Sequence, residues 1–164
     1  MALLEIRDLK TYFFMTKGVV KAVDGVSFDI KRGETFGLAG ESGCGKTTTA
    51  YSIMRLVPYP GRIVDGKITF DGVDILSMDE EEFRKIRWKR ISMIFQGAMN
   101  ALNPVFRIGD QIAEAMMIHN RNITKEEAMR RVKELFEAVG LDPSRVNCYP
   151  HEFSGGMRQR AMIA

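Results

Sequence analysis

The residues from Gly40 to Thr47 have the types and the spacing needed to hold a phosphate group. They read Gly-Glu-Ser-Gly-Cys-Gly-Lys-Thr and match the pattern G-x-x-x-x-G-K-[ST]. Glycines permit positive φ angles, so several backbone N–H groups of such a loop can point at one anion. Lys46 supplies a positive charge for the β- and γ-phosphates of a nucleotide, and the Thr47 hydroxyl suits Mg²⁺. The motif predicts a nucleotide site, and a glycine-rich turn with an incidental lysine is the alternative.

The segments on either side of this loop favour the nucleotide interpretation. Residues 35–39 are short, mostly apolar and bounded by glycines, which predicts a buried strand. Residues 46–56 predict a helix that ends before Pro58. The start of that helix adds about half a positive charge beside the loop. Strand, loop and helix in this order are the context that the motif requires.

Composition limits the class of protein. The chain has 164 residues, of which 45 % are hydrophobic and 27 % charged, with a net charge of +3, which suits one globular domain. No secretory signal peptide is expected, since Glu5 interrupts the start of the chain, and the apolar runs are too short to cross a bilayer. Cys44 and Cys148 do not form a disulfide framework, which predicts a reduced, intracellular setting.

The most basic segment, residues 84–90, is a candidate for binding a polyanion such as nucleic acid. Residues 79–82 are all acidic and directly precede it, and Ser77 with Glu80 predicts a capping box. Acids at the start of a helix and bases at its end are the arrangement that the helix dipole favours. A solvated helix is therefore the preferred interpretation, and no nucleic-acid partner is expected.

The remaining patterns predict a β-rich segment, 1–96, followed by a helical segment, 97–164. The strand-like stretches, short and rich in apolar or β-branched residues, are 3–13, 19–30, 67–75 and 91–95. Asp71-Gly72 supplies a hairpin turn within the third of them.

Two helices are expected in the second segment, at residues 108–120 and 124–139. Thr124 and Glu127 form a predicted capping box at the start of the second helix. Gly140 is expected to end it, because glycine adopts the left-handed conformation that closes many helices.

A second glycine motif begins another helix close to residue 164. Ser154 is a preferred N-cap residue, and Gly155 and Gly156 follow it directly. The exposed N–H groups and the dipole at such a helix start suit an anion. One nucleotide rarely needs two anion-binding helix starts, unless the second serves a neighbouring copy of the chain. A plain capped helix is the alternative.

Together these motifs resemble the nucleotide-binding domain of ATP-binding cassette (ABC) transporters, over essentially the whole chain. Residues 40–47 match the Walker A loop, Gln96 the Q-loop glutamine and residues 153–157 the signature motif. Phe13 lies where the family places an aromatic side chain that stacks on adenine, with Tyr12 as its rival. Only one of the two is expected to face the base, because side chains alternate along a strand, and Phe13 is favoured.

The resemblance implies an α/β fold: a P-loop NTPase (ABC ATPase) core with an antiparallel β-subdomain and a helical subdomain, incomplete because the Walker B half is absent. The Walker B Asp-Glu pair and the switch histidine of the family are not in this sequence, so no catalytic residue is expected in it. Thr47 and Gln96 are implied to hold Mg²⁺. The residues implied to contact ATP are Phe13, Gly40, Glu41, Ser42, Gly43, Cys44, Gly45, Lys46, Thr47, Thr48, Gln96, Ser154, Gly155 and Gly156.

Within the family, the chain looks similar to the oligopeptide/dipeptide importer class, through residues 18–28, 40–43, 94–105 and 149–160. It departs from that class after Gln96, where Gly97-Ala98 replaces the usual Asp-Pro. We therefore expect a different shape for the loop that meets the membrane subunit.

The resemblance implies an ATP-binding subunit of a peptide importer, peripheral to the cytoplasmic face of the plasma membrane. The implied partners are a second ABC ATPase subunit, in a head-to-tail homo- or heterodimer, transmembrane permease subunits and an extracellular solute-binding protein. The full-length protein is expected to be an ATPase, whereas residues 1–164 alone are expected to bind ATP weakly and not to hydrolyse it. The alternatives that stay open are a non-transport ABC ATPase, an importer for oligosaccharide or nickel, and a pure binding module.

Overall fold

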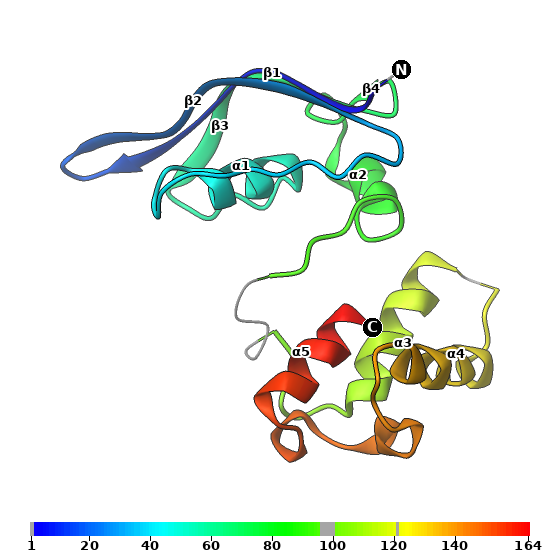
Figure 1. The fold of residues 1–164 in the computed structure, drawn as a ribbon. Coiled ribbons are helices and arrows are strands. Elements are labelled where there is room, and N and C mark those ends of the chain that lie inside the picture. Colours follow the sequence, from blue (N-terminus) through cyan, green and yellow to red (C-terminus); the bar gives the residue numbers. More distant parts are fainter. Residues whose placement is uncertain (1, 96–100, 121) are drawn as a thin grey trace. The chain divides into compact units, whose positions relative to one another are not determined.

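The structure, a computed structural model, describes residues 2–95, 101–120 and 122–164. Two compact units divide the chain, Met1–Ser92 and Met93–Ala164 (Figure 1). Each unit has its own hydrophobic core, and each is described by itself.

The first unit is built on a four-stranded antiparallel sheet in the order β2-β1-β3-β4. Its strands are β1 (Ala2–Met15), β2 (Gly18–Lys31), β3 (Gly61–Phe70) and β4 (Val73–Asp74). The predicted strands at 3–13, 19–30 and 67–75 are confirmed, although β3 begins earlier than predicted. The hairpin turn between β3 and β4 is also confirmed, with positive φ angles of 51° at Asp71 and 83° at Gly72.

A bulge in the central strand β1 changes which of its side chains, the even-numbered or the odd-numbered, face the core. Before the bulge the buried side chains are Leu4 and Ile6, and after it they are Leu9 and Thr11. The pairing of β1 with both neighbours is irregular at this level, and Asp8 has a φ of 46°. One extra residue in a strand reverses the alternation of everything that follows. Odd-numbered positions therefore face the helix side of the sheet from Leu9 onward.

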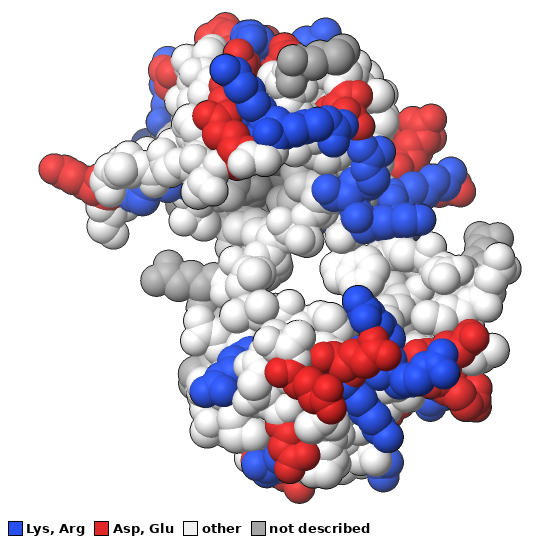
Figure 2. All heavy atoms as spheres, turned by 45° about the vertical axis from the view of Figure 1, so that its right-hand side comes forward, with Lys and Arg blue, Asp and Glu red and all other residues white. Residues whose placement is uncertain are grey.

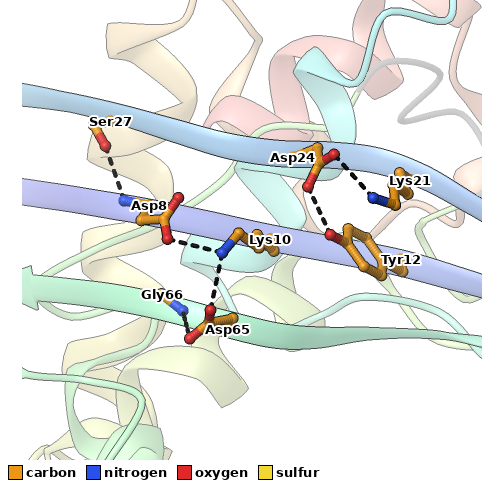
Figure 3. A network of polar contacts seen from close by, with 8 residues as sticks. All are labelled: Asp8, Lys10, Tyr12, Lys21, Asp24, Ser27, Asp65 and Gly66. Atoms are coloured by element: carbon orange, nitrogen blue, oxygen red, sulfur yellow. Dashed lines mark hydrogen bonds and ion pairs between the residues drawn. The ribbon is translucent and has the colours of Figure 1, made fainter.

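Gly66 on β3 accommodates this bulge by allowing the two backbones to approach closely. Its φ is 102°, and a Cβ there would lie 2.6 Å from Leu9 Cα and 2.7 Å from the Asp8 carbonyl oxygen. On the outer face, Lys10 Nζ donates to carboxylate oxygens of Asp8 and Asp65 at 2.8 and 3.0 Å (Figure 3). These hydrogen bonds, the one to Asp8 first, raise the pKa of Lys10, and the one to Asp65 joins β1 to β3 at the irregular level.

The helix predicted after the phosphate loop is confirmed as α1 (Lys46–Ile53), although it ends earlier than expected. Arg55 adopts a φ of 53°, a conformation that an α-helix cannot continue through. Its guanidinium donates to the carbonyl oxygens of Ile75 and Met78 and stacks 5.0 Å from the Phe83 ring centroid. These tertiary contacts hold the Arg55 side chain at the end of the helix.

The second helix of this unit, α2 (Glu80–Ile86), has a capping box, but not the predicted one. The N-cap is Asp79, whose carboxylate accepts from Glu82 N at 2.7 Å, while Glu82 Oε2 accepts from Asp79 N at 3.2 Å. The pair Ser77 and Glu80 was therefore wrong. The Ser77 hydroxyl instead donates to a backbone carbonyl of the preceding turn, so it is not available at the helix start.

Two of the five basic side chains of residues 84–90, at the end of α2, form ion pairs with carboxylates. Arg87 donates to Glu80 at 2.8 Å and Arg90 to Asp71 at 2.5 Å. The guanidinium of Arg87 also lies 4.8 Å from the Phe83 ring centroid. Ion pairs with neighbouring acids fit the interpretation of a solvated helix better than a polyanion site.

Two predicted strands are wrong. Residues 35–39 form no ladder and are not buried, and Phe36 stacks on Phe28 of β2 at 4.8 Å instead. Residues 91–95 form only an isolated bridge at their first residue, and Ile94 is 57 % exposed. A strand needs a hydrogen-bonded neighbour, and within the described part of the chain neither segment belongs to the sheet β2-β1-β3-β4.

The second unit is helical. Its elements are α3 (Ile108–His119), α4 (Lys125–Ala138), the 3₁₀ helices η2 (Pro143–Asn147) and η3 (Pro150–Glu152), and α5 (Gly155–Ile163). Both predicted helices are confirmed, and so is the capping box: Thr124 Oγ1 accepts from Glu127 N at 3.2 Å, and Glu127 Oε2 from Thr124 N at 2.9 Å. Gly140 ends α4 with a φ of 71°, as expected.

Apolar side chains from α3, α4, η2 and α5 meet in the core of the second unit. The members of that core that are fully or almost fully buried are Ile108, Ala113, Ala128, Val132, Phe136, Val146, Phe153 and Ala161. Acidic and basic side chains are interspersed on the visible face of this unit (Figure 2, lower part). Among the described residues, none of the helices is long and apolar enough to span a lipid bilayer.

Candidate nucleotide-binding site

The phosphate loop has the backbone conformation that its glycines predict. Positive φ angles occur at Gly40 (156°), Gly43 (84°) and Gly45 (92°), and Gly45 is the N-cap of α1. The loop closes on itself through Cys44 N, which donates to the Glu41 carbonyl oxygen at 3.3 Å. Left-handed residues directly before a helix turn backbone N–H groups toward one point, which is the geometry of an anion site.

The loop rests directly on strand β2. A Cβ added at Gly45 would overlap the carbonyl oxygen of Ala22 and lie 3.2 Å from its carbonyl carbon. Ala22 is the extra residue of a second irregularity, because Thr11 pairs with Val23 while Tyr12 pairs with Lys21. The bulge in β2 thus presents a carbonyl group to the loop, and only glycine leaves room for it.

Lys46 lies across the mouth of the loop. Its Nζ donates to the carbonyl oxygens of Gly40 and Glu41 at 2.8 and 2.6 Å, and lies 3.4 Å from Cys44 Sγ. An ammonium group has three donors and no acceptor, so these carbonyls hold it where a phosphate oxygen would compete for it. The lysine is therefore positioned at the loop by the loop's own backbone.

The three threonines after Lys46 differ in exposure. Thr47 is exposed at the start of α1, Thr48 is half-buried and Thr49 is buried, with its hydroxyl donating to the Gly45 carbonyl oxygen at 3.0 Å. Mg²⁺ is usually held by one or two protein oxygens together with phosphates and water. An exposed hydroxyl at Thr47 fits that role.

Phe13 and Tyr12 lie on opposite faces of β1. The Tyr12 hydroxyl donates to Asp24 at 2.6 Å on the outer face, where Lys21 also reaches Asp24 (Figure 3). This hydrogen bond raises the pKa of the Tyr12 phenol and lowers the pKa of the Asp24 carboxyl. Phe13 has the same parity as buried Thr11, so it faces the side of the sheet on which α1 packs.

The Phe13 ring occupies a close approach between β1 and β3. A Cβ at Gly61 would lie 2.6 Å from Phe13 Cε1 and 2.7 Å from Val57 Cγ1. The ring is half-buried, so part of it stays open to a ligand. The first unit thus contains both an aromatic ring, on β1, and a phosphate loop, which precedes α1 and rests on β2.

The second glycine motif belongs to the other unit and has a different geometry. Ser154 Oγ accepts from Met157 N at 3.3 Å, which confirms Ser154 as the N-cap of α5. Phe153 anchors this helix start: it is 4 % exposed and packs edge-to-face on Phe136 at 6.3 Å. Gly156 is exposed and an added Cβ there would meet nothing within 4 Å. Gln96 lies outside the described residues.

Sequence reasoning missed the residues that support the loop, Ala22, Thr11, Ser52 and Gly61. Nothing local marks Ala22, because its bulge arises from the pairing of β1 with β2. Gly61 did carry a usable signal, since a glycine within a strand often marks a close approach of a neighbouring group. That neighbour is the ring of Phe13.

The phosphate loop at the start of α1 and the adjoining sheet define the chain as a P-loop nucleotide-binding protein. A family model described as ABC transporter matches residues 23–164. The chain therefore belongs to the ABC transporter family, as its motifs predicted.

Named relatives place it further within that family. The chain is 48 % identical, over 99 % of its length, to a probable peptide ABC transporter ATP-binding protein, y4tR, of Sinorhizobium fredii, and covers 49 % of that protein. It is 50 % identical, again over 99 % of its length, to the oligopeptide transport ATP-binding protein AppD of Bacillus subtilis, and covers 50 % of it. The predicted likeness to the oligopeptide/dipeptide class is confirmed, and the chain spans about half the length of these relatives.

The fold is that of a known ABC cassette. The dimeric structure of MJ0796, a bacterial ABC transporter cassette, matches with a TM-score of 0.86 at 26 % identity, over 98 % of this chain and 67 % of that one. The predicted fold class, an ABC ATPase core with an antiparallel β layer and helices, is confirmed.

Proposed function

We propose that this chain is the ATP-binding portion of an ABC importer for oligopeptides or dipeptides. The observation that carries the proposal is the phosphate loop, with left-handed Gly43 and Gly45 directly before α1, in a chain about half identical to peptide-transport ATP-binding proteins. In the transport system, ATP binding and hydrolysis by the complete subunit drive uptake.

The residues have separate roles in this proposal. Backbone N–H groups from Gly40 to Gly45, with Thr48, surround the phosphates, and Lys46 moves from the Gly40 and Glu41 carbonyls to the β- and γ-phosphates. Thr47 and Gln96 hold Mg²⁺, which neutralises charge on the phosphates. Phe13 stacks on adenine from the α1 side of the sheet.

The start of α5 serves a second subunit. We place Ser154, Gly155 and Gly156 against the γ-phosphate of ATP bound to a partner ATPase subunit, in a head-to-tail homo- or heterodimer. The exposed, capped helix start supports this role, because its N–H groups are available to an anion outside the unit. The similar MJ0796 cassette is dimeric in its solved structure, which supports a paired arrangement here.

The permease subunits dock on the second unit. A groove of about 540 Å³ runs along α3 and is lined by Phe106, Asp110, Gln111, Ala113, Glu114, Met117, Ile118 and Lys125. Its exposed apolar side chains suit an amphipathic segment of a membrane subunit, which supports a location on the cytoplasmic face of the plasma membrane. An extracellular solute-binding protein delivers the peptide to the same complex.

Isothermal titration with ATP–Mg²⁺ tests the proposal directly. Residues 1–164 should bind ATP weakly, and Lys46→Ala should abolish the binding, because each charge-assisted hydrogen bond contributes about 1.5–3 kcal/mol. Lys17→Ala, in the turn between β1 and β2, is the matched control and should bind as the unchanged chain does. Equal affinity in the Lys46 variant would remove that residue from its role.

A phosphate-release assay tests the narrower statement that residues 1–164 do not hydrolyse ATP by themselves. The general base and the switch histidine that the family resemblance implies are not among these residues. Turnover at ordinary ATPase rates would contradict this part of the proposal while leaving nucleotide binding intact.

A further inference from the structure

Two fully buried hydroxyl groups link the sheet to the phosphate-loop helix. Thr11 of β1 and Ser52 of α1 are each 0 % exposed, and their oxygens lie 2.7 Å apart. The surrounding core of this unit is apolar. A buried polar group without a partner costs about 1–3 kcal/mol, so the Thr11 hydroxyl depends on Ser52.

The direction of the hydrogen bond follows from a third group. Ser52 Oγ lies 2.7 Å from the carbonyl oxygen of Thr48, which can only accept. The single proton of Ser52 is therefore used there, and Thr11 must donate its own proton to Ser52. The chain of hydrogen bonds runs from Thr11 through Ser52 to the first turn of α1.

The two ends of this series of hydrogen bonds lie next to the two halves of the proposed nucleotide site, the aromatic ring for the base and the loop for the phosphates. Thr11 is two positions before Phe13 and on the same face of β1. At the other end, Thr48 follows Lys46 and Thr47 directly. A second contact, between Gly45 and Ala22, fixes the N-terminus of α1 on β2. The helix α1 therefore contacts the sheet near both of its ends. These two contacts together fix its position on the sheet and its rotation about its own axis.

We propose that Thr11 and Ser52 are positioning residues that set the spacing between the Phe13 ring and the phosphate loop; this rests on the proposed function. An apolar pair of the same shape would fill the space equally well, and would often cost little stability. What the hydroxyl pair adds is a directional contact of fixed length. ATP spans the base and phosphate ends at once, whereas a bare phosphate chain senses only the loop.

The test compares ATP with inorganic tripolyphosphate, both with Mg²⁺, by isothermal titration. Thr11→Val removes the hydroxyl and keeps the shape, and should weaken ATP about tenfold, the equivalent of one lost hydrogen bond, with tripolyphosphate unchanged within about twofold. Thr11→Ser retains the hydroxyl and should restore ATP affinity. Thr69→Val, on the outer face of β3, is the matched control and should change neither ligand.

The double variant Thr11→Val/Ser52→Ala guards against a variant that fails to fold. It removes both hydroxyls, leaves no unpaired donor, and should show the same selective loss of ATP affinity. Equal losses of ATP and tripolyphosphate affinity, or no loss of either, would show that the pair is only a core contact and overturn the inference. A wild-type chain that binds tripolyphosphate but not ATP would overturn the proposed function as well as this inference. In that case, titration of Lys46→Ala with tripolyphosphate shows whether that ligand binds at the phosphate loop.

Discussion

The two glycine-rich helix starts of this chain look alike in sequence but are held by different forces. At α1 the glycine requirement is internal: Gly45 has a φ of 92°, and Ala22 leaves no space for a side chain. At α5 the space around Gly156 is open, and the Ser154 side chain closes the helix start. The first start is fixed by the fold of its own unit. The second helix start has open space around Gly156, so no neighbouring atom within its own unit requires a glycine there.

The largest effect is therefore expected from Gly45→Ala. The new Cβ would overlap the Ala22 carbonyl and force a left-handed alanine, which together should cost about 3 kcal/mol of unfolding free energy. Chemical denaturation measures that loss, and ATP binding should disappear with it. Gly43→Ala is the control: it has a positive φ but open space, and should cost only about 1 kcal/mol. Equal effects of the two changes would mean that Ala22 does not confine the loop.

A smaller loss is expected at the other helix start. Ser154→Ala removes the N-cap acceptor for Met157 N and should destabilise the chain by about 1 kcal/mol. ATP affinity of residues 1–164 should stay the same, because Ser154 lies in the helical unit and is proposed to serve a partner. Ser154→Asp should restore the cap, and a drop in ATP affinity with Ser154→Ala would contradict the division of roles.

This contrast also shows what local rules can predict. The positive φ angles of the phosphate loop, the Thr124–Glu127 capping box and the end of α4 at Gly140 follow from short local patterns, and all appeared as expected. The cap of α2 was missed although it is local, because Ser77 and Asp79 both precede acids at the right spacing. A distant contact cannot be read this way: the Arg55 side chain, at the end of α1, donates to carbonyls more than one element away.

The strands show the same limit more strongly. Residues 35–39 have the composition of a strand but form none, since strand formation depends on a partner that the pattern itself does not supply. The face of the sheet on which Phe13 lies depends on the bulge at Asp8. The pattern of residues 9–13 alone does not predict that bulge. Alternation correctly put Tyr12 and Phe13 on opposite faces. The extra residue of the bulge, which precedes residues 9–13, determines which of the two side chains lies on the α1 side.

Gly156→Ala should have the opposite sign from Gly45→Ala. Alanine is favoured over glycine within a helix, so unfolding free energy should rise by up to about 1 kcal/mol. The open space at this position accepts the methyl group without rearrangement. Thermal unfolding and ATP titration of residues 1–164 should show a slightly higher melting temperature and unchanged affinity. A loss of stability would mean that the position is confined from within, as Gly45 is.

The smallest effect concerns a third kind of helix start, that of α4, where a carboxylate takes part in the cap. The backbone N–H of Thr124, then its side chain, lowers the pKa of Glu127 below its ordinary value of 4.5. A carboxyl group whose pKa is lower in the folded state stabilises the fold above its unfolded pKa and loses that contribution as pH falls through the folded value. Stability should therefore decrease below about pH 4.5 more in the unchanged chain than in Glu127→Gln. Urea midpoints measured from about pH 6 to about pH 3 give the comparison, and parallel curves for the two chains would show that the Glu127 charge adds nothing. The cap of α5 uses a serine hydroxyl that does not titrate in this range, so Ser154→Ala should shift the whole curve without changing its slope.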